Sequence, residues 1–296
     1  MHAYSSSGVF LKELQSDFSK CERSIMSLAK QISSSIIHLR SPTSNAIAKR
    51  LREKSDEVER LQILKNILPH TIDILHISNR IFIMPEIQGL KYQNIHLRSV
   101  NDVFADRILP HVPFVIIKTI LLQIILCLQA AHSVDPEFCH NDLKLDNILI
   151  EEKECSIGNI HFENMIRIVF IDAETVTGTK FPPLSIDAPK ELKAEFGLGL
   201  EWSEYTDIHL VLLEMWSKIR KTALRQEFQV FLENIMPLPI FDSFQEGNKC
   251  LTPRNRLSEK GRAIIKSLQH CGKCLPFQEM HTQSFFSEIK QNVVSS

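Results

Sequence analysis

The chain has 296 residues, of which 44% are hydrophobic, which is enough for a substantial core in one large domain or two lobes. Its formal net charge is −1, so no global field favours nucleic acid or an anionic membrane, and we expect neither as a partner. The seven cysteines are scattered and odd in number, and the first residues lack a secretory pattern. These features favour a reducing compartment, and we expect the cytoplasm. They leave the oligomeric state open.

The first part of the chain predicts few strands. Residues 8–12 follow three serines and are typical of a turn leading into a strand. From Glu13 to about Leu68 the chain is polar and amphipathic, with a loop expected at 41–45. Residues 57–68 predict a helix because their apolar side chains recur at helical spacing. Two apolar runs, 72–77 and 81–84, then predict an antiparallel hairpin because a Ser-Asn-Arg turn separates them.

Beyond Gly89 the sequence predicts mainly helices. The most apolar stretch, 112–133, contains Lys118 and Gln123, which favours a buried helix over a membrane span. Short strands are expected at 148–150 and 166–171, on either side of an inserted hairpin. Further helices are expected at 207–221, 225–234 and 257–270. Early strands followed by helices around a central polar loop indicate an α+β fold with two lobes and a cleft.

The central loop carries the residue types that phosphoryl transfer needs. It reads His140-Asn141-Asp142-Leu143-Lys144-Leu145-Asp146-Asn147 and continues into an apolar run. A second apolar run ends in Asp172-Ala173-Glu174. An aspartate can orient the nucleophile and accept its proton, a lysine can lie beside the transferred group, and an Asn and an Asp can hold magnesium.

These motifs resemble those of the protein kinase superfamily over roughly Val9 to His270. Asp142 precedes Asn147 by five residues, as in the kinase pattern H-R-D-x-x-x-x-N. The Ala-Ala-His-Ser end of the preceding apolar stretch is similar to the helix before that loop, and Asp-Leu-Lys is similar to Ser/Thr kinases. The divergent style resembles kinase-like proteins of large DNA viruses such as iridoviruses. For a viral protein this implies the host cell cytoplasm.

The resemblance implies a protein-kinase-like fold with a reduced or divergent N-terminal lobe at 1–88 and a mainly helical catalytic lobe at 89–296. It implies ATP and magnesium as cofactors and a protein as substrate. Asp142 would then be the catalytic base, and Lys144 would contact the transferred phosphoryl group. Asn147 and Asp172 would bind magnesium. Asp207 resembles the aspartate at a helix start that anchors the backbone of the catalytic loop.

The residues that hold ATP are less defined in the sequence. Lys12, in Val-Phe-Leu-Lys, resembles the ATP lysine of V-A-I-K and is the first choice. Lys49 is the second, although its surroundings predict a helix. Glu59 is the expected partner of this lysine, with Glu22 as the alternative if a helix follows Lys12 directly. Glu86, in Pro-Glu-Ile-Gln-Gly, lies in the expected hinge, where backbone groups would meet adenine.

The kinase pattern is broken at three places, which leaves two alternative functions open. Asn141 replaces the arginine that normally receives an activation-segment phosphate, so we expect activity that does not depend on phosphorylation there. Asp-Ala-Glu replaces Asp-Phe-Gly, and no G-x-G-x-x-G occurs. The missing glycine loop raises the alternative of a pseudokinase acting as a binding module. The second alternative is a small-molecule phosphotransferase, because the His-Asn-Asp and Asp-x-Glu motifs together are similar to those of choline and aminoglycoside kinases.

A Cys-x-x-Cys pair near the end of the chain is a candidate metal site. Cys271 and Cys274, with His270 and His281 nearby in sequence, have side chains of the kind that hold zinc. Because no second pair of this spacing occurs, ordinary reduced cysteines are favoured over a structural zinc site.

Overall fold

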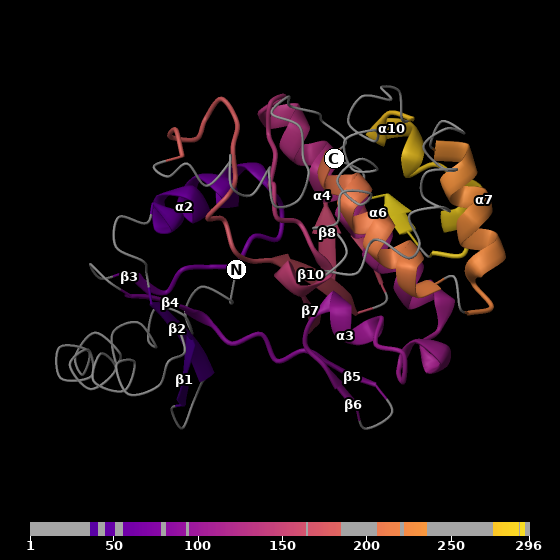
Figure 1. Cartoon of the computed structure of the whole chain (residues 1–296), viewed down its shortest axis with the longest axis horizontal. Coiled ribbons are helices and arrows are strands. Elements are labelled where there is room, and N and C mark those ends of the chain that lie inside the picture. The colour runs from indigo at the N-terminus through magenta and orange to yellow at the C-terminus, as the bar shows by residue number, and fades with distance from the viewer. Residues whose placement is uncertain are drawn as a thin grey trace, which may run out of the picture.

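The computed structural model describes ten stretches of the chain. They are residues 36–40, 45–50, 56–77, 81–92, 95–163, 165–184, 206–219, 222–235, 275–289 and 291–293. The strand expected at 8–12, the helix expected at 257–270 and the Cys271/Cys274 pair lie outside these residues. Strands β1 to β4 and helix α2 lie at one end of the molecule, and α4, α6, α7 and α10 lie at the other (Figure 1).

An antiparallel sheet of four strands, in the order β1-β2-β4-β3, lies at the same end of the molecule as α2. Its strands are β1 (Ile36–Arg40), β2 (Asn45–Arg50), β3 (His76–Ile77) and β4 (Ile81–Pro85). The predicted pairing of the two apolar runs is confirmed, because His76 pairs with Ile83. The expectation of few strands before Leu68, and of helical surroundings for Lys49, is wrong. Ala46 and Ala48 are buried in alternation along β2, which is the period of a strand.

Helix α2 (Glu57–Ile67) matches its predicted range closely. Leu61, Leu64 and Ile67 are buried at helical spacing and belong to the main core. The helix ends at Leu68, and His70 follows with a φ of 61°. The turn leads the chain back along the next sheet, since the N–H of Ile72 donates to the carbonyl oxygen of Phe170 at 3.0 Å.

A hairpin and a short helix stand where the sequence predicted mainly helix. Strands β5 (Leu90–Tyr92) and β6 (Ile95–Leu97) pair antiparallel, and α3 (Val100–Val103) follows. Ser99 caps α3 because its hydroxyl accepts from the N–H of Asp102, whose carboxylate accepts from the N–H of Ser99 in return. The hairpin begins after Gly89, which has a φ of 78° and lies so close to the Leu97 carbonyl that a side chain there would clash.

Helix α4 (Phe114–Val134) is the centre of the larger part of the fold. It is long and apolar enough to cross a membrane by length and composition, but 72% of its most apolar window is buried inside the protein. The prediction of a buried core helix is therefore confirmed. Its buried Gln123 donates to the carbonyl oxygen of Ile166 at 2.6 Å and accepts from the N–H of Ile168 at 3.1 Å. These two bonds fix strand β10 (Ile166–Phe170) against the helix.

Two small sheets carry the polar loops. The two strands that the apolar runs predicted are confirmed, and β7 (Ile148–Glu152) pairs antiparallel with β10. The inserted hairpin is also confirmed, as β8 (Cys155–Ile157) and β9 (Ile160–Phe162). Near the end of the chain β11 (Gln291–Val293) pairs with β9.

The remaining helices are α6 (Thr206–Ile219), α7 (Arg225–Ile235) and α10 (Phe277–Met280), with the 3-10 turns η1 (Leu109–His111), η2 (Leu145–Asn147) and η3 (Ser284–Phe286). An aromatic cluster joins α6, α7 and η3. The rings of Phe231 and Phe285 stack with centroids 4.5 Å apart. Beside them the buried Lys118 of α4 forms ion pairs with Glu227 and Glu288. A buried ammonium needs such partners, so these pairs join α4 to α7 and to the end of the chain.

The half-buried ring of His70 predicts a loss of stability in mild acid. Burial, with the charge of Arg167 nearby, lowers the pKa of His70 from 6.5 to about 4. A histidine with a lowered pKa stabilises the fold above its unfolded pKa, and this contribution is lost as the pH falls from 6.5 through about 4. We expect roughly 2–3 kcal/mol of unfolding free energy to be lost over this window.

Denaturant unfolding at several pH values measures this loss. His70→Asn should flatten the dependence between pH 6.5 and 4, because Asn tolerates a positive φ and does not titrate. An unchanged pH slope in this variant would contradict the assignment.

Candidate functional site

The ammonium group of Lys49 lies between two carboxylates from distant parts of the chain. Its Nζ is 2.5 Å from Oε1 of Glu57 on α2 and 3.5 Å from Oδ1 of Asp172, which follows β10. The side chains of Lys49 and Glu57 are 18% and 3% exposed, whereas that of Asp172 is 33% exposed. The pair is thus largely shielded from water on the Glu57 side and open to solvent on the Asp172 side.

This arrangement keeps Lys49 charged. Burial alone would lower the pKa of Lys49, but the charges of Asp172 and Glu57 outweigh it and raise the pKa above its ordinary value. A lysine that is protonated at all physiological pH values and faces solvent beside a carboxylate can hold an anionic group such as a phosphate.

The predicted loop residues are brought together around Asp142. Nζ of Lys144 donates to Oδ2 of Asp142 at 2.7 Å. The side-chain amide of Asn147 donates to the same oxygen at 3.0 Å and to the backbone carbonyl of Asp142 at 2.8 Å. Two donors therefore hold one carboxylate oxygen, which fixes the orientation of the Asp142 side chain.

The loop and Asp172 are joined through the backbone. The N–H of Ile171 donates to the carbonyl oxygen of Asn147 at 3.1 Å, so the next residue, Asp172, lies directly beside the loop. Asp172 has a φ of 66°, a left-handed conformation that is uncommon outside glycine and that Asp tolerates better than most residues. This turn of the backbone separates the buried Phe170 and Ala173 and leaves the Asp172 side chain partly exposed between them.

Two acidic residues of α6 accept hydrogen bonds from the backbone of the central loop. The buried Asp207 accepts from the N–H groups of His140 at 2.6 Å and Asn141 at 3.0 Å, which confirms the predicted anchoring role. Glu214 accepts from the N–H of Leu145 at 2.9 Å and was not predicted. Its position seven residues after Asp207, two turns along one face of a helix, is a signal that could have indicated it.

Asn141 connects the loop to the segment after Asp172. It has a φ of 64°, and its amide nitrogen donates to the carbonyl oxygen of Thr175 and to the hydroxyl of Thr177, both at 2.9 Å. The hydroxyl of Thr175 in turn donates to the carbonyl oxygen of His140 at 2.9 Å, and the His140 side chain is buried, as expected for a structural residue. Neutral hydrogen bonds therefore occupy the place that the kinase pattern gives to an arginine.

The expected acidic partner of the lysine is corrected by the structure. Glu59 is exposed on α2, and Glu57, two residues earlier, faces Lys49. Two residues along a helix turn a side chain by more than half a circle, so both cannot face the same group. The first-choice lysine, Lys12, and the alternative acid Glu22 lie outside the described residues, and the second choice, Lys49, is the lysine at the site. Glu86 lies in the half-buried segment directly after β4.

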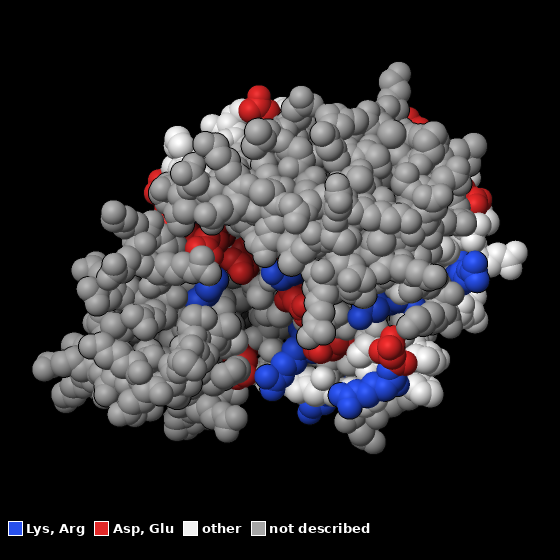
Figure 2. Space-filling model, in the orientation of Figure 1, with Lys and Arg blue, Asp and Glu red and all other residues white. Residues whose placement is uncertain are grey.

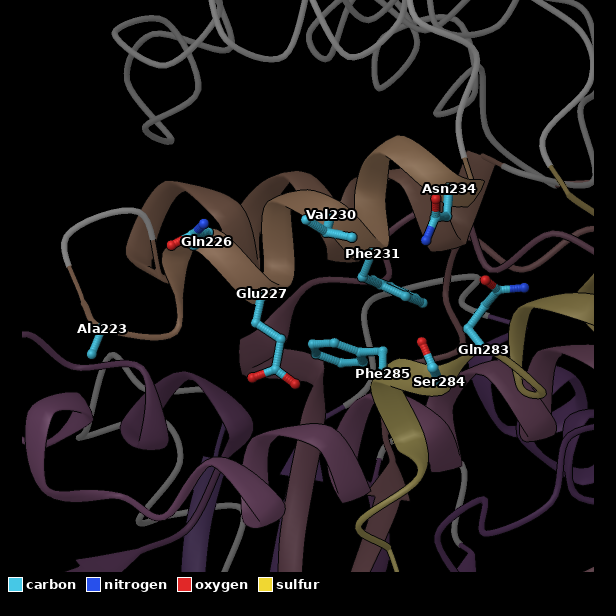
Figure 3. Close-up of a pocket in the computed structure, with 9 residues that line it drawn as sticks. All are labelled: Ala223, Gln226, Glu227, Val230, Phe231, Asn234, Gln283, Ser284 and Phe285. Atoms are coloured by element: carbon cyan, nitrogen blue, oxygen red, sulfur yellow. The ribbon is translucent and has the colours of Figure 1, made fainter.

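Charged side chains gather where these elements meet. On the face shown in Figure 2, acidic and basic side chains lie next to one another along the hollow in the middle of the molecule. A separate cavity of about 380 Å³ lies between α7 and η3 (Figure 3). Glu227 is its charged lining residue, and this carboxylate is paired with Lys118. The cavity therefore lacks the groups for phosphoryl transfer that surround Asp142.

Comparison with known proteins shows to which protein family the chain belongs. Residues 54–246, more than half of the chain, match the family described as poxvirus serine/threonine protein kinase. The chain belongs to this family. Among solved structures the kinase is similar to "WaaP in complex with acyl carrier protein", with 10% sequence identity, 83% of this chain and 84% of that chain covered, and a TM-score of 0.41. No curated protein matches its sequence.

Membership of the family confirms the predicted class of the protein. It is a viral Ser/Thr protein kinase, an enzyme that uses ATP to phosphorylate proteins, and its described residues form a mixture of α and β elements. The matched range includes Glu57, Asp142 and Asp172 and begins five residues after Lys49. The family favours this interpretation over the binding-module and small-molecule alternatives.

The ion pair predicts a clear ranking of variants. Lys49→Met and Glu57→Gln should each lower kcat/KM for ATP by about 10²-fold or more, because we expect the lysine–glutamate pair to position the phosphates. Glu59→Gln, two residues away on the exposed side of α2, should stay within about twofold. Phosphorylation of a protein substrate with labelled ATP measures all three. Lys12→Met tests the other lysine, and lost activity there with full activity in Lys49→Met would contradict the assignment.

The contacts of Asn141 predict a kinase that needs no phosphate between Asp172 and Asp207. Phosphatase treatment should leave its specific activity unchanged, because neutral hydrogen bonds already connect the loop to Thr175 and Thr177. Asn141→Gly keeps the backbone conformation but removes the amide and should lower kcat by about tenfold. Mass spectrometry of the treated protein is the control. A fall in activity that follows loss of a phosphate from this segment would contradict the prediction.

Proposed function

We propose that this kinase transfers the γ-phosphoryl group of ATP to a Ser or Thr hydroxyl of a protein, with Asp142 as the catalytic base. The observation that supports the proposal is the meeting of Lys49, Glu57 and Asp172 beside the hydrogen-bonded group of Asp142, Lys144 and Asn147. These residues come from β2, α2, the central loop and the end of β10. A set that meets only in the folded chain is suited to positioning, which supplies most of the rate in phosphoryl transfer.

Asp142 orients the attacking hydroxyl and accepts its proton. One of its oxygens is held by Lys144 and Asn147, so the carboxylate has a fixed direction before substrate arrives. The hydroxyl proton passes to this carboxylate as the oxygen bonds to phosphorus and the bond to the ADP oxygen breaks. The ammonium of Lys144 is near enough to offset negative charge on the transferred group, and Lys49 offsets charge on the remaining phosphates.

The donor set at the ends of the loop fits magnesium. The carboxylate of Asp172 is partly exposed, and the amide nitrogen of Asn147 is used in both of its bonds to Asp142, so its amide oxygen is the group suited to a cation. Hard cations of this size prefer one or two protein oxygens together with water and phosphate oxygens. We propose that Asn147 and Asp172 hold magnesium, which when bound neutralises charge on the phosphates. Within the described residues no cluster of three or more His, Cys, Asp or Glu side chains could hold a metal.

We propose further that the nucleotide binds between two lobes. The sheet of β1 to β4 with α2 would form a reduced N-terminal lobe, and the helices around α4 would form the other. Backbone groups of Glu86 and of Ile87 or Gln88 would meet adenine, because this segment connects β4 to β5 and is fixed at its end by Gly89. The boundary near residue 88 and the cytoplasmic location stay predictions.

Replacement of Asp142 separates catalysis from binding. Asp142→Ala should abolish transfer of labelled phosphate to a generic protein substrate, because no group is left to orient the hydroxyl. Binding of Mg-ATP should persist, and a ligand at about 100 times its Kd should stabilise both the wild type and the variant by roughly 2.7 kcal/mol in thermal unfolding. Asp172→Asn should instead reduce the magnesium-dependent part of this stabilisation.

Three outcomes would contradict the proposal. Wild-type turnover in Asp142→Ala would remove the role of this residue. Absence of stabilisation by Mg-ATP in the wild type would favour a binding module. ATP turnover that is stimulated by choline-like or aminoglycoside substrates, without labelling of protein, would favour a small-molecule kinase.

A further inference from the structure

Arg60 is a fully buried arginine that the site described above does not include. It lies on α2, three residues after Glu57, and has no exposed surface. Residues three apart on a helix lie on the same face, so Arg60 and Glu57 both point from α2 toward the rest of the protein. Guanidinium is always charged in proteins and costly to bury, so its partners indicate its role.

The partners of Arg60 are mainly backbone carbonyl oxygens of the segment after Asp172. Nη1 donates to Val176 at 2.5 Å, and Nη2 donates to Pro182 at 2.8 Å and to Pro183 at 3.1 Å. Nη2 also lies 2.7 Å from the carboxylate of Asp56, at the start of α2. Three carbonyls that span eight residues thus meet at one side chain. These bonds fix the path of the segment whatever its side chains are.

Other contacts hold the same segment from different sides. Asn141 connects it to the central loop, as described above. Asp135, at the end of α4, accepts from the N–H groups of Thr179 and Lys180 at 3.1 Å and from the Thr179 hydroxyl at 2.9 Å. Gly178 lies against the Asp135 carboxylate so closely that a Cβ would clash. Among the described contacts, Arg60 is the one that connects the segment to the helix carrying Glu57.

We propose that Arg60 is a positioning residue that couples α2 to the segment after Asp172 and so keeps Glu57, Lys49 and Asp172 in their catalytic arrangement. The inference rests on the proposed function, since it assigns a means of holding the same site. The energetic reason is that withdrawal of the segment would leave a buried cation with one carboxylate partner, so α2 and the segment are stable only together. The coupling needs no phosphate, because carbonyl oxygens take the place of a charged acceptor.

Steady-state kinetics and hydrogen exchange test the coupling together. Arg60→Met, which keeps much of the side-chain volume, should lower kcat by about 10²-fold while the KM for ATP changes less than about threefold, because misplacement by about 1 Å mainly affects the transition state. Amide exchange in residues 175–181 should be faster by about tenfold, with exchange in α4 unchanged. Arg60→Lys keeps the charge and part of the hydrogen bonding and should recover part of kcat.

Matched variants separate this role from general destabilisation. Lys65→Met changes an exposed residue of the same helix and should leave kcat and exchange as in the wild type. If Arg60→Met does not fold, Arg60→Gln and Arg60→Lys give the same comparison with donors retained. A folded Arg60 variant with wild-type kcat and wild-type exchange at 175–181 overturns the inference. A failure of the proposed function would give a different result. Asp142→Ala would then keep wild-type activity, while Arg60→Met would still show faster amide exchange.

Discussion

The ammonium group of Lys49 lies between carboxylates that are separated by more than a hundred residues in sequence, and the rest of the site depends on this meeting. Glu57 holds the lysine from α2, and Asp172 reaches it from the end of β10. The buried Glu57 carboxylate is costly to bury alone and acceptable beside the lysine. This requirement of charge therefore acts together with the apolar packing of α2 and β2 to bring the sheet, the helix and the end of β10 into one arrangement.

Helix α4 provides the framework on which this charged arrangement is built. Its middle holds β10 through Gln123, its end holds the segment after Asp172 through Asp135, and its Lys118 joins the helices at the far end of the molecule. Burial of the Asp135 carboxyl would raise its pKa, but the donors from Thr179 and Lys180 outweigh it and hold the pKa below the ordinary value. A few buried polar side chains on or next to this apolar helix thus fix a strand, a loop and a second helix, because their partners lie in β10, in the segment after Asp172 and in α7.

The sequence predicted those features that depend on local pattern. The order and spacing of Asp142, Asn147 and Asp172 indicated the chemistry, and apolar periodicity indicated α2 and α4. The sequence predicted Glu59 as the acidic partner of the lysine, whereas the structure has Glu57. Spacing along the sequence cannot show which of two positions on opposite sides of a helix faces the lysine. The sequence also did not reveal β2 around Lys49, where alanines carry weak strand propensity and the pairing with β4 decides the structure. Contacts such as Glu214 with Leu145 depend on tertiary packing and leave only a faint trace in sequence.

The strand β11 gives the end of the chain a part in the fold. It covers β9, the outer strand of the inserted hairpin, with residues that lie about 130 positions later in sequence. An uncovered strand edge presents a row of free N–H and C=O groups to any neighbouring molecule. Shortening the chain before Gln291 would thus leave the edge of β9 unpaired and open to other molecules. Its cost would be self-association of an otherwise competent enzyme, so solubility and catalysis are protected by different parts of the same chain.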